Sequence, residues 1–156
     1  MKRKNTDFLL LANIYHKVKN NHEALRSVEQ YLFNEVQDLH AINIRGEINL
    51  DLDNIDDAAK DFYSVLHYEP HSAVAQMNYG YVLTKKEDYN TAAPLIDNSV
   101  DVLKDEPRQQ FYAGFYYMKT GQNEKALDCF NRAKELGWEH HGLNYYIHEV
   151  DGGAAT

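Results

Sequence analysis

The chain has little of what several classes of protein require. It has one cysteine, Cys129, in 156 residues, so no disulfide can form within it. A reducing compartment such as the cytoplasm is expected, and the periplasm stays open if a signal was removed before this numbering begins. No stretch approaches the ~20 apolar residues of a membrane-spanning helix, so membrane insertion is not expected. The formal net charge is −8 at pH 7, which argues against nucleic acid as a partner because phosphate binding needs a basic surface.

Residue patterns that would support catalysis or a cofactor are also missing. The sequence has no glycine-rich phosphate loop, no nucleophile elbow and no paired cysteines. His67 and His71 are four residues apart, but Pro70 should end the helix between them. His140 and His141 are adjacent and should point in different directions, whereas a zinc site needs three or four convergent ligands. We therefore expect a non-enzymatic protein with no metal and no cofactor.

One fixed period of 34 residues runs through almost the whole chain. Three sets of positions keep this period, one alanine, one small and one large. They are Ala24, Ala58, Ala92 and Ala126; Ala12, Gly46, Gly80 and Gly114; and Val28, Phe62, Ile96 and Phe130. Glycine inside a helix costs about 1 kcal/mol, so three glycines at one phase point to a place where two helices approach closely. The large residues should fill the space between the paired helices.

This pattern resembles the tetratricopeptide repeat (TPR), in which stacked helix pairs recur every ~34 residues. The resemblance covers residues 5 to 140 and implies an all-α fold, a right-handed solenoid of four helix-turn-helix repeats in one domain over 1–156. The expected repeats are residues 5–38, 39–72, 73–106 and 107–140. Leu143, Ile147 and Val150 form one apolar stripe, which predicts a C-terminal capping helix over about 142–150. Residues 151–156 are expected to form a flexible tail.

Prolines and glycines mark the expected helix boundaries. Pro70 should end the second helix of repeat two, and Pro107 should begin the first helix of repeat four. Pro94 is expected in the first turn of a helix, where a missing N–H costs least. Gly121 should make the last inter-helix turn, and Gly137 should close the second helix of repeat four.

The resemblance also implies a binding surface. In TPR proteins the first helices of successive repeats line a concave groove, through fixed places in each repeat. Transferred to this chain, those places give five residues in each repeat, and nine of these are our candidate partner-binding residues: Asn43, Glu47, Met77, Tyr81, Arg108, Phe111, Phe115, Met118 and Lys119. Methionine and aromatic side chains suit a surface that anchors a partner, and we expect those of repeats three and four not to be needed for packing. The alternatives are that the capping helix folds over them or that a second copy packs there.

We therefore expect a protein–protein interaction module, adaptor or chaperone-like, that binds a peptide segment of another protein in this groove. The acidic second repeat should favour a basic residue on the partner. One alternative is an assembly scaffold that self-associates through the aromatic groove face as a homodimer. Another is a chaperone similar to the small bacterial TPR chaperones of type III secretion or to the TPR proteins of pilus assembly.

Overall fold

The computed structural model describes residues 4–154, and every regular element in that range is an α-helix. The helices fall into two compact units, Met1–Pro70 and His71–Thr156. The first unit contains α1 (Asn5–Lys17), α2 (Asn21–Leu32), α3 (Leu39–Asp51) and α4 (Ile55–Tyr68). The second contains α5 (Ala73–Lys85), α6 (Tyr89–Ser99), α7 (Pro107–Lys119), α8 (Asn123–Glu135) and α9 (Leu143–Ala154). The predicted all-α class is confirmed.

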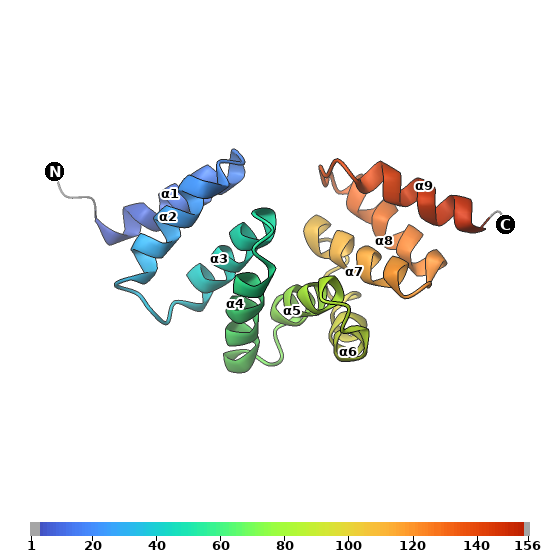
Figure 1. The fold of residues 1–156 in the computed structure, drawn as a ribbon, viewed down its shortest axis with the longest axis horizontal. Coiled ribbons are helices and arrows are strands. Elements are labelled where there is room, and N and C mark those ends of the chain that lie inside the picture. Colours follow the sequence, from blue (N-terminus) through green and yellow to red (C-terminus); the bar gives the residue numbers. More distant parts are fainter. Residues whose placement is uncertain (1–3, 155–156) are drawn as a thin grey trace. The chain divides into compact units, whose positions relative to one another are not determined.

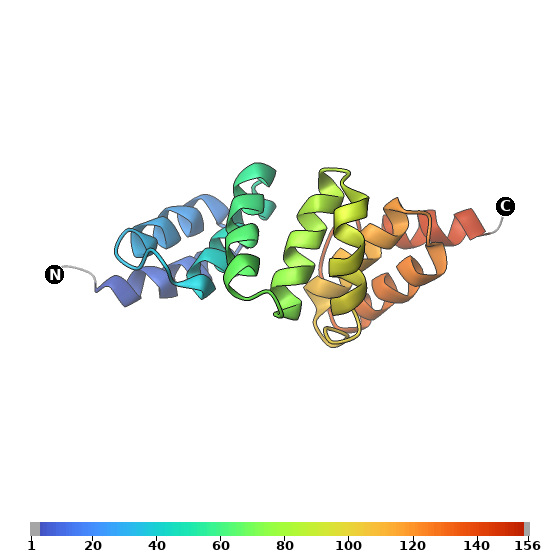
Figure 2. The same ribbon diagram turned by 90° about the horizontal axis from the view of Figure 1, so that it is seen from below.

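Each unit consists of helix pairs joined by short turns. Within the first unit α1 packs on α2 and α3 packs on α4, while α5–α6 and α7–α8 form the pairs of the second unit (Figure 1 and, from below, Figure 2). The helix α9 follows the last pair and packs on α8. No helix within residues 4–154 combines the length and the apolar character needed to cross a bilayer.

The small and large residues of the period meet inside each pair. A Cβ added to Gly46 would lie 2.6 Å from a Phe62 ring carbon, and one added to Gly114 would lie 2.6 Å from Phe130. These distances are too short for any side chain, so glycine allows the first helix to rest directly on the ring. In the first pair Ala12 replaces glycine and the smaller Val28 replaces phenylalanine, and both are fully buried. The space between the helices is therefore filled by a matched small and large residue.

The turns between paired helices repeat with the same period. At each turn the chain adopts a left-handed conformation, and an N–H reaches back five residues to a carbonyl at 2.8–2.9 Å. The left-handed residues are Lys19, Asp53, Glu87 and Gly121. Gly137 closes α8 in the same way, with φ 85°, as the sequence predicts. These are Schellman motifs, which satisfy the last carbonyls of a helix and reverse the chain.

Three boundaries differ from the sequence prediction. The helix α2 ends at Leu32, whereas the sequence pattern predicts a helix that continues to about Glu35. The helix α6 begins at Tyr89, so Pro94 is its sixth residue and not part of its first turn. The helix α9 continues to Ala154, where a tail was expected from Asp151; residues 155–156 lie outside the described range. Two glycines, at 152 and 153, discouraged a helical prediction there because glycine is a poor helix former.

Candidate interaction face

The nine candidate residues divide between the two units. Asn43 and Glu47 lie on α3 in the first unit, where both are half-buried and Asn43 Nδ2 donates a hydrogen bond to Glu47 Oε1 at 3.1 Å. The other seven lie on α5 and α7 in the second unit. The second unit therefore carries all the apolar candidates, and the first carries two polar candidates that are hydrogen-bonded to each other.

Three of the seven are buried rather than displayed. Met77 is fully buried, and Tyr81 and Phe111 expose 8% and 2% of their surfaces. The Phe111 ring centroid lies 4.5 Å from that of His140, 5.9 Å from Phe130 and about 6 Å from Trp138 and Tyr146. The expectation that Phe111 is not needed for packing is therefore wrong: α8, α9 and the segment between them fold over it.

A row of three rings runs from α5 across α7 to α9. The centroid of Phe115 lies 5.5 Å from that of Tyr81 and 5.9 Å from that of Tyr146, both in edge-to-face geometry. The ring of Tyr112 stacks on that of Tyr81, with 3.9 Å between the ring centroids. Phe115 and Tyr146 are half-buried. We call Tyr81, Phe115 and Tyr146 the ring row.

Cationic side chains accompany these rings. The Lys85 Nζ lies 6.0 Å from the Tyr81 ring centroid, and the Lys119 Nζ lies 5.4 Å from that of Phe115. These lysines end α5 and α7. The guanidinium of Arg108, at the other end of α7, lies 5.0 Å from the Trp138 ring. The half-buried Met118 precedes Lys119 on α7. The face thus offers aromatic contact surface next to positive charge.

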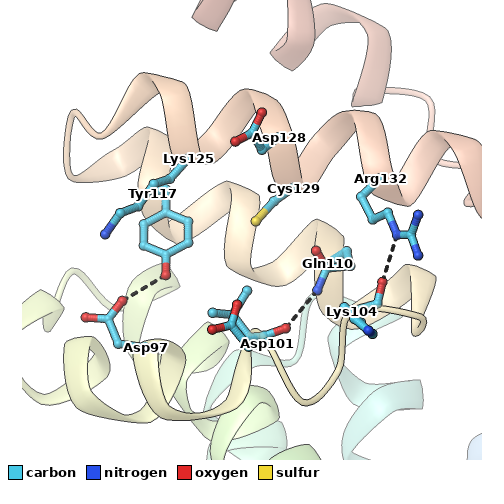
Figure 3. A pocket seen from close by; sticks show the side chains of 10 residues that line it. Asp97, Asp101, Lys104, Gln110, Tyr117, Lys125, Asp128, Cys129 and Arg132 are labelled. Carbon is cyan, nitrogen blue, oxygen red and sulfur yellow. Dashed lines mark hydrogen bonds between the residues drawn. The ribbon is translucent and has the colours of Figure 1, made fainter.

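A pocket of about 600 Å³ lies elsewhere in the second unit, between α6, α7 and α8 (Figure 3). Tyr117 Oη donates to Asp97 Oδ1 at 2.8 Å on one side, and Arg132 Nε donates to the Lys104 carbonyl at 3.1 Å on the other. The Cys129 thiol in the wall is buried, and this burial raises its pKa to about 12. A thiol with that pKa stays protonated near neutral pH, and only a thiolate is a good nucleophile.

Within residues 4–154, no three His, Cys, Asp or Glu side chains lie close enough together to bind a metal ion. The pocket therefore offers hydrogen-bonded polar walls without an activated nucleophile, and the ring row offers the clearer recognition chemistry.

The fold and its repeat period agree with comparison to known proteins. Residues 113–136 match the family model described as tetratricopeptide repeat. Together with the repeated helix pairs, this match makes the chain similar to tetratricopeptide-repeat proteins. It is 26% identical over 118 residues to tetratricopeptide repeat protein 13 of Homo sapiens, a match that covers 76% of this chain and 14% of that relative.

Solved TPR structures share the fold. The thermophilic TPR protein TTC0263 of Thermus thermophilus superposes with a TM-score of 0.76 and 17% identity, over 97% of this chain and 83% of that one. YrrB, described as a TPR protein with an unusual peptide-binding site, has a TM-score of 0.62 and 18% identity, over 97% of this chain and 78% of that one. At these identities the likeness concerns the fold alone.

Tyr146 is a member of the ring row that sequence reasoning missed. The sequence predicts a capping helix at this position through the stripe Leu143, Ile147 and Val150, which does not include Tyr146. The groove places do not include it: Tyr146 stands one full repeat after Tyr112, and from that position Tyr112 contacts Tyr81 while Tyr146 contacts Phe115. The helix α9 thus takes the place of the first helix of a further repeat, and it delivers a ring to the same row.

Proposed function

We propose that this TPR chain is a non-enzymatic module that binds a peptide segment of another protein through the ring row. The observation that supports it is the run of edge-to-face rings from three helices, with lysine ammonium groups 5.4 and 6.0 Å from two of them. A matching segment carries an aromatic or long aliphatic side chain beside an aspartate or glutamate. The apolar group packs on Phe115 and Tyr146, and the carboxylate pairs with Lys119.

The arrangement suits recognition energetically. The rings sit on helices whose turns and pairs are already packed, so little of the protein must be ordered on binding. A central aromatic contact that excludes water typically costs at least about 2 kcal/mol when it is truncated. A few such anchors suffice for a short segment. The peptide-binding description of YrrB adds a precedent in the same fold.

Other roles from the sequence prediction stay alternatives to this proposal. They are self-association through the ring row, a basic partner residue at the acidic second repeat, and a chaperone role in bacterial secretion or pilus assembly. We take the cytoplasm as the site of action, which suits one buried, unpaired thiol. None of these alternatives explains the pairing of rings with lysines as directly as an acidic, apolar segment does.

The test is selection of a random peptide display library on the wild-type chain, followed by fluorescence anisotropy with the selected peptides. We expect peptides that combine an aromatic or long aliphatic residue with Asp or Glu. Phe115→Ala and Lys119→Glu should each weaken their binding by about tenfold or more, which corresponds to about 1.4 kcal/mol. Raised salt should weaken the wild-type complex and should have less effect on the complex of the Lys119→Glu variant.

Two control variants match these changes. Tyr63→Ala removes an aromatic ring that is 56% exposed on α4, and Lys134→Glu reverses a charge in the last turn of α8, as Lys119→Glu does in α7. Both should bind like wild type. Selected peptides without acidic residues, or peptides that bind Phe115→Ala as tightly as wild type, would contradict the proposal.

A further inference from the structure

The first helix carries an apolar stripe on its outer surface. Leu10 and Ile14 on α1, and Val18 at its C-cap, follow one another at intervals of four residues, and they are 60%, 48% and 67% exposed. Intervals of four place side chains on one face of a helix. Large apolar side chains scattered singly are normal on a protein surface, but a contiguous row of them marks an interaction site.

The repeat register assigns a role to these positions. In α3 the residues one repeat after Leu10 and Ile14 are Ile44 and Ile48, which are 6% and 0% exposed, and α3 packs on the preceding helix α2. In α7 the residue at the phase of Leu10 is Tyr112, which is buried and stacks on Tyr81 of the preceding repeat. The stripe therefore occupies the positions through which a first helix docks onto what precedes it.

The helix α9 differs from the earlier first helices at two positions of the repeat. The earlier first helices place a small residue against their partner helix, and α9 has His148 at that position. At the position of the buried Tyr117 of α7, α9 has Asp151. His148 and Asp151 are both exposed. This polar surface on α9 is a poor match for an apolar stripe, which argues against a head-to-tail chain of copies.

Charged residues complete the stripe in a self-complementary way. Asp7 and Lys17 lie on the same face of α1, since 7, 10, 14 and 17 follow the three-and-four spacing of a helix–helix seam. Both side chains are exposed. The pairs 7 with 17 and 10 with 14 share the same midpoint, residue 12. An antiparallel second copy of α1 centred there brings Asp7 beside Lys17 of the copy and Leu10 beside Ile14 of the copy, twice over.

We propose that the chain forms a two-fold dimer through α1, with the stripe of each copy covering that of the other. Such an interface is isologous and closes at two copies. It uses the first unit and leaves the ring row in the second unit to another partner. The apolar residues supply the association, and the two Asp7–Lys17 contacts set the antiparallel direction, in the way that charges at the edges of a coiled-coil seam select orientation.

Sedimentation equilibrium of the full chain over low to high micromolar concentrations tests the dimer. Wild type should reach a dimer mass, and Ile14→Glu should raise the dissociation constant by about tenfold or more. Val102→Glu, at a residue that is 72% exposed between α6 and α7, is the control and should dimerise like wild type. Circular dichroism should give equal helix content for all three proteins, because both substituted side chains are exposed.

A charge exchange tests the direction. Asp7→Lys and Lys17→Glu should each weaken self-association, because each brings like charges together. An equal mixture of these two variants should recover a heterodimer, because every contact then joins opposite charges. The carboxylate of Asp7 also accepts the backbone N–H of Lys4 at 2.9 Å, so the recovery in the mixture separates a lost contact from a frayed helix.

Three outcomes would overturn the proposal: a wild-type chain that stays monomeric throughout, an Ile14→Glu variant that dimerises unchanged, or a mass that grows beyond the dimer. Failure here is distinguishable from failure of the ring row. Ile14→Glu should still bind the peptides selected on wild type, and Phe115→Ala should still dimerise.

Discussion

Replacing Phe111 and Phe115 one at a time separates the core from the proposed binding surface. Both side chains are on α7, four residues apart, and both belong to the phases expected to face a partner. Phe111 is 2% exposed and contacts rings from α8, α9 and the segment that joins them. Phe115 is half-buried between Tyr81 and Tyr146. The two substitutions to alanine should therefore act on different properties.

The magnitudes follow from burial. Truncating a fully buried phenylalanine to alanine costs about 3–5 kcal/mol through lost transfer energy and the cavity left behind. For Phe115, where part of the ring already meets water, we expect roughly 1–2 kcal/mol. In a chain of this size each kcal/mol lowers the melting temperature by roughly 2–4 °C. Phe111→Ala should thus melt roughly 6 to 20 °C below wild type, and Phe115→Ala no more than about 8 °C below it.

Urea unfolding with two probes measures this difference. Circular dichroism follows the helices as a whole, and the fluorescence of Trp138, the only tryptophan, follows the C-terminal end, where its ring lies 6.1 Å from that of Phe111. Phe111→Ala should shift the tryptophan transition at least as far as the helix transition, since repeat arrays can unfold from one end. If Phe111→Ala proves no more destabilising than Phe115→Ala, the assignment of Phe111 to the core is refuted.

Two further predictions concern the turns and the thiol. Glu87→Gly should raise the free energy of unfolding by up to about 1 kcal/mol, because φ is 63° there and a left-handed conformation costs a residue with a Cβ about 1–2 kcal/mol, of which glycine's greater unfolded entropy returns part. Gly121→Ala, at the same place of the next turn, should lower the free energy of unfolding by a similar amount, because φ is 76° there. An added Cβ meets no atom within 4 Å, so no steric clash adds to that cost. Urea melts that show the opposite signs would contradict this. Burial raises the pKa of Cys129 to about 12, so its contribution to stability is complete below the ordinary thiol pKa and is lost as the pH rises toward 12. Native Cys129 should react with iodoacetamide at pH 8 far more slowly than the urea-unfolded chain, and equal rates measured by mass spectrometry would refute its burial.

The sequence alone determined the repeat and its packing. A fixed spacing between equivalent positions is a local, additive signal, because each helix pair depends mainly on its own small and large residues and on its neighbours. For that reason the sequence by itself places Gly46, Phe62, Gly114 and Phe130 at helix contacts. Pro94 and the end of α9 were harder, because helix propensity is a weak prior that packing overrides.

Only the tertiary structure decided which side chains of the expected binding face remain accessible. Phe111 and Phe115 are the same residue type on the same helix, and their phases differ by one helical turn. They differ in exposure because the rings of Phe130, Trp138 and His140 pack around Phe111 in addition to Tyr146, whereas the rings beside Phe115 are those of Tyr81 and Tyr146. Coverage of that kind depends on how the segment after α8 folds back over α7, and the periodicity of the repeats does not encode the path of that segment. The same reason applies to Leu10 and Ile14, whose apolar character is plain in the sequence but whose exposure depends on what packs against α1.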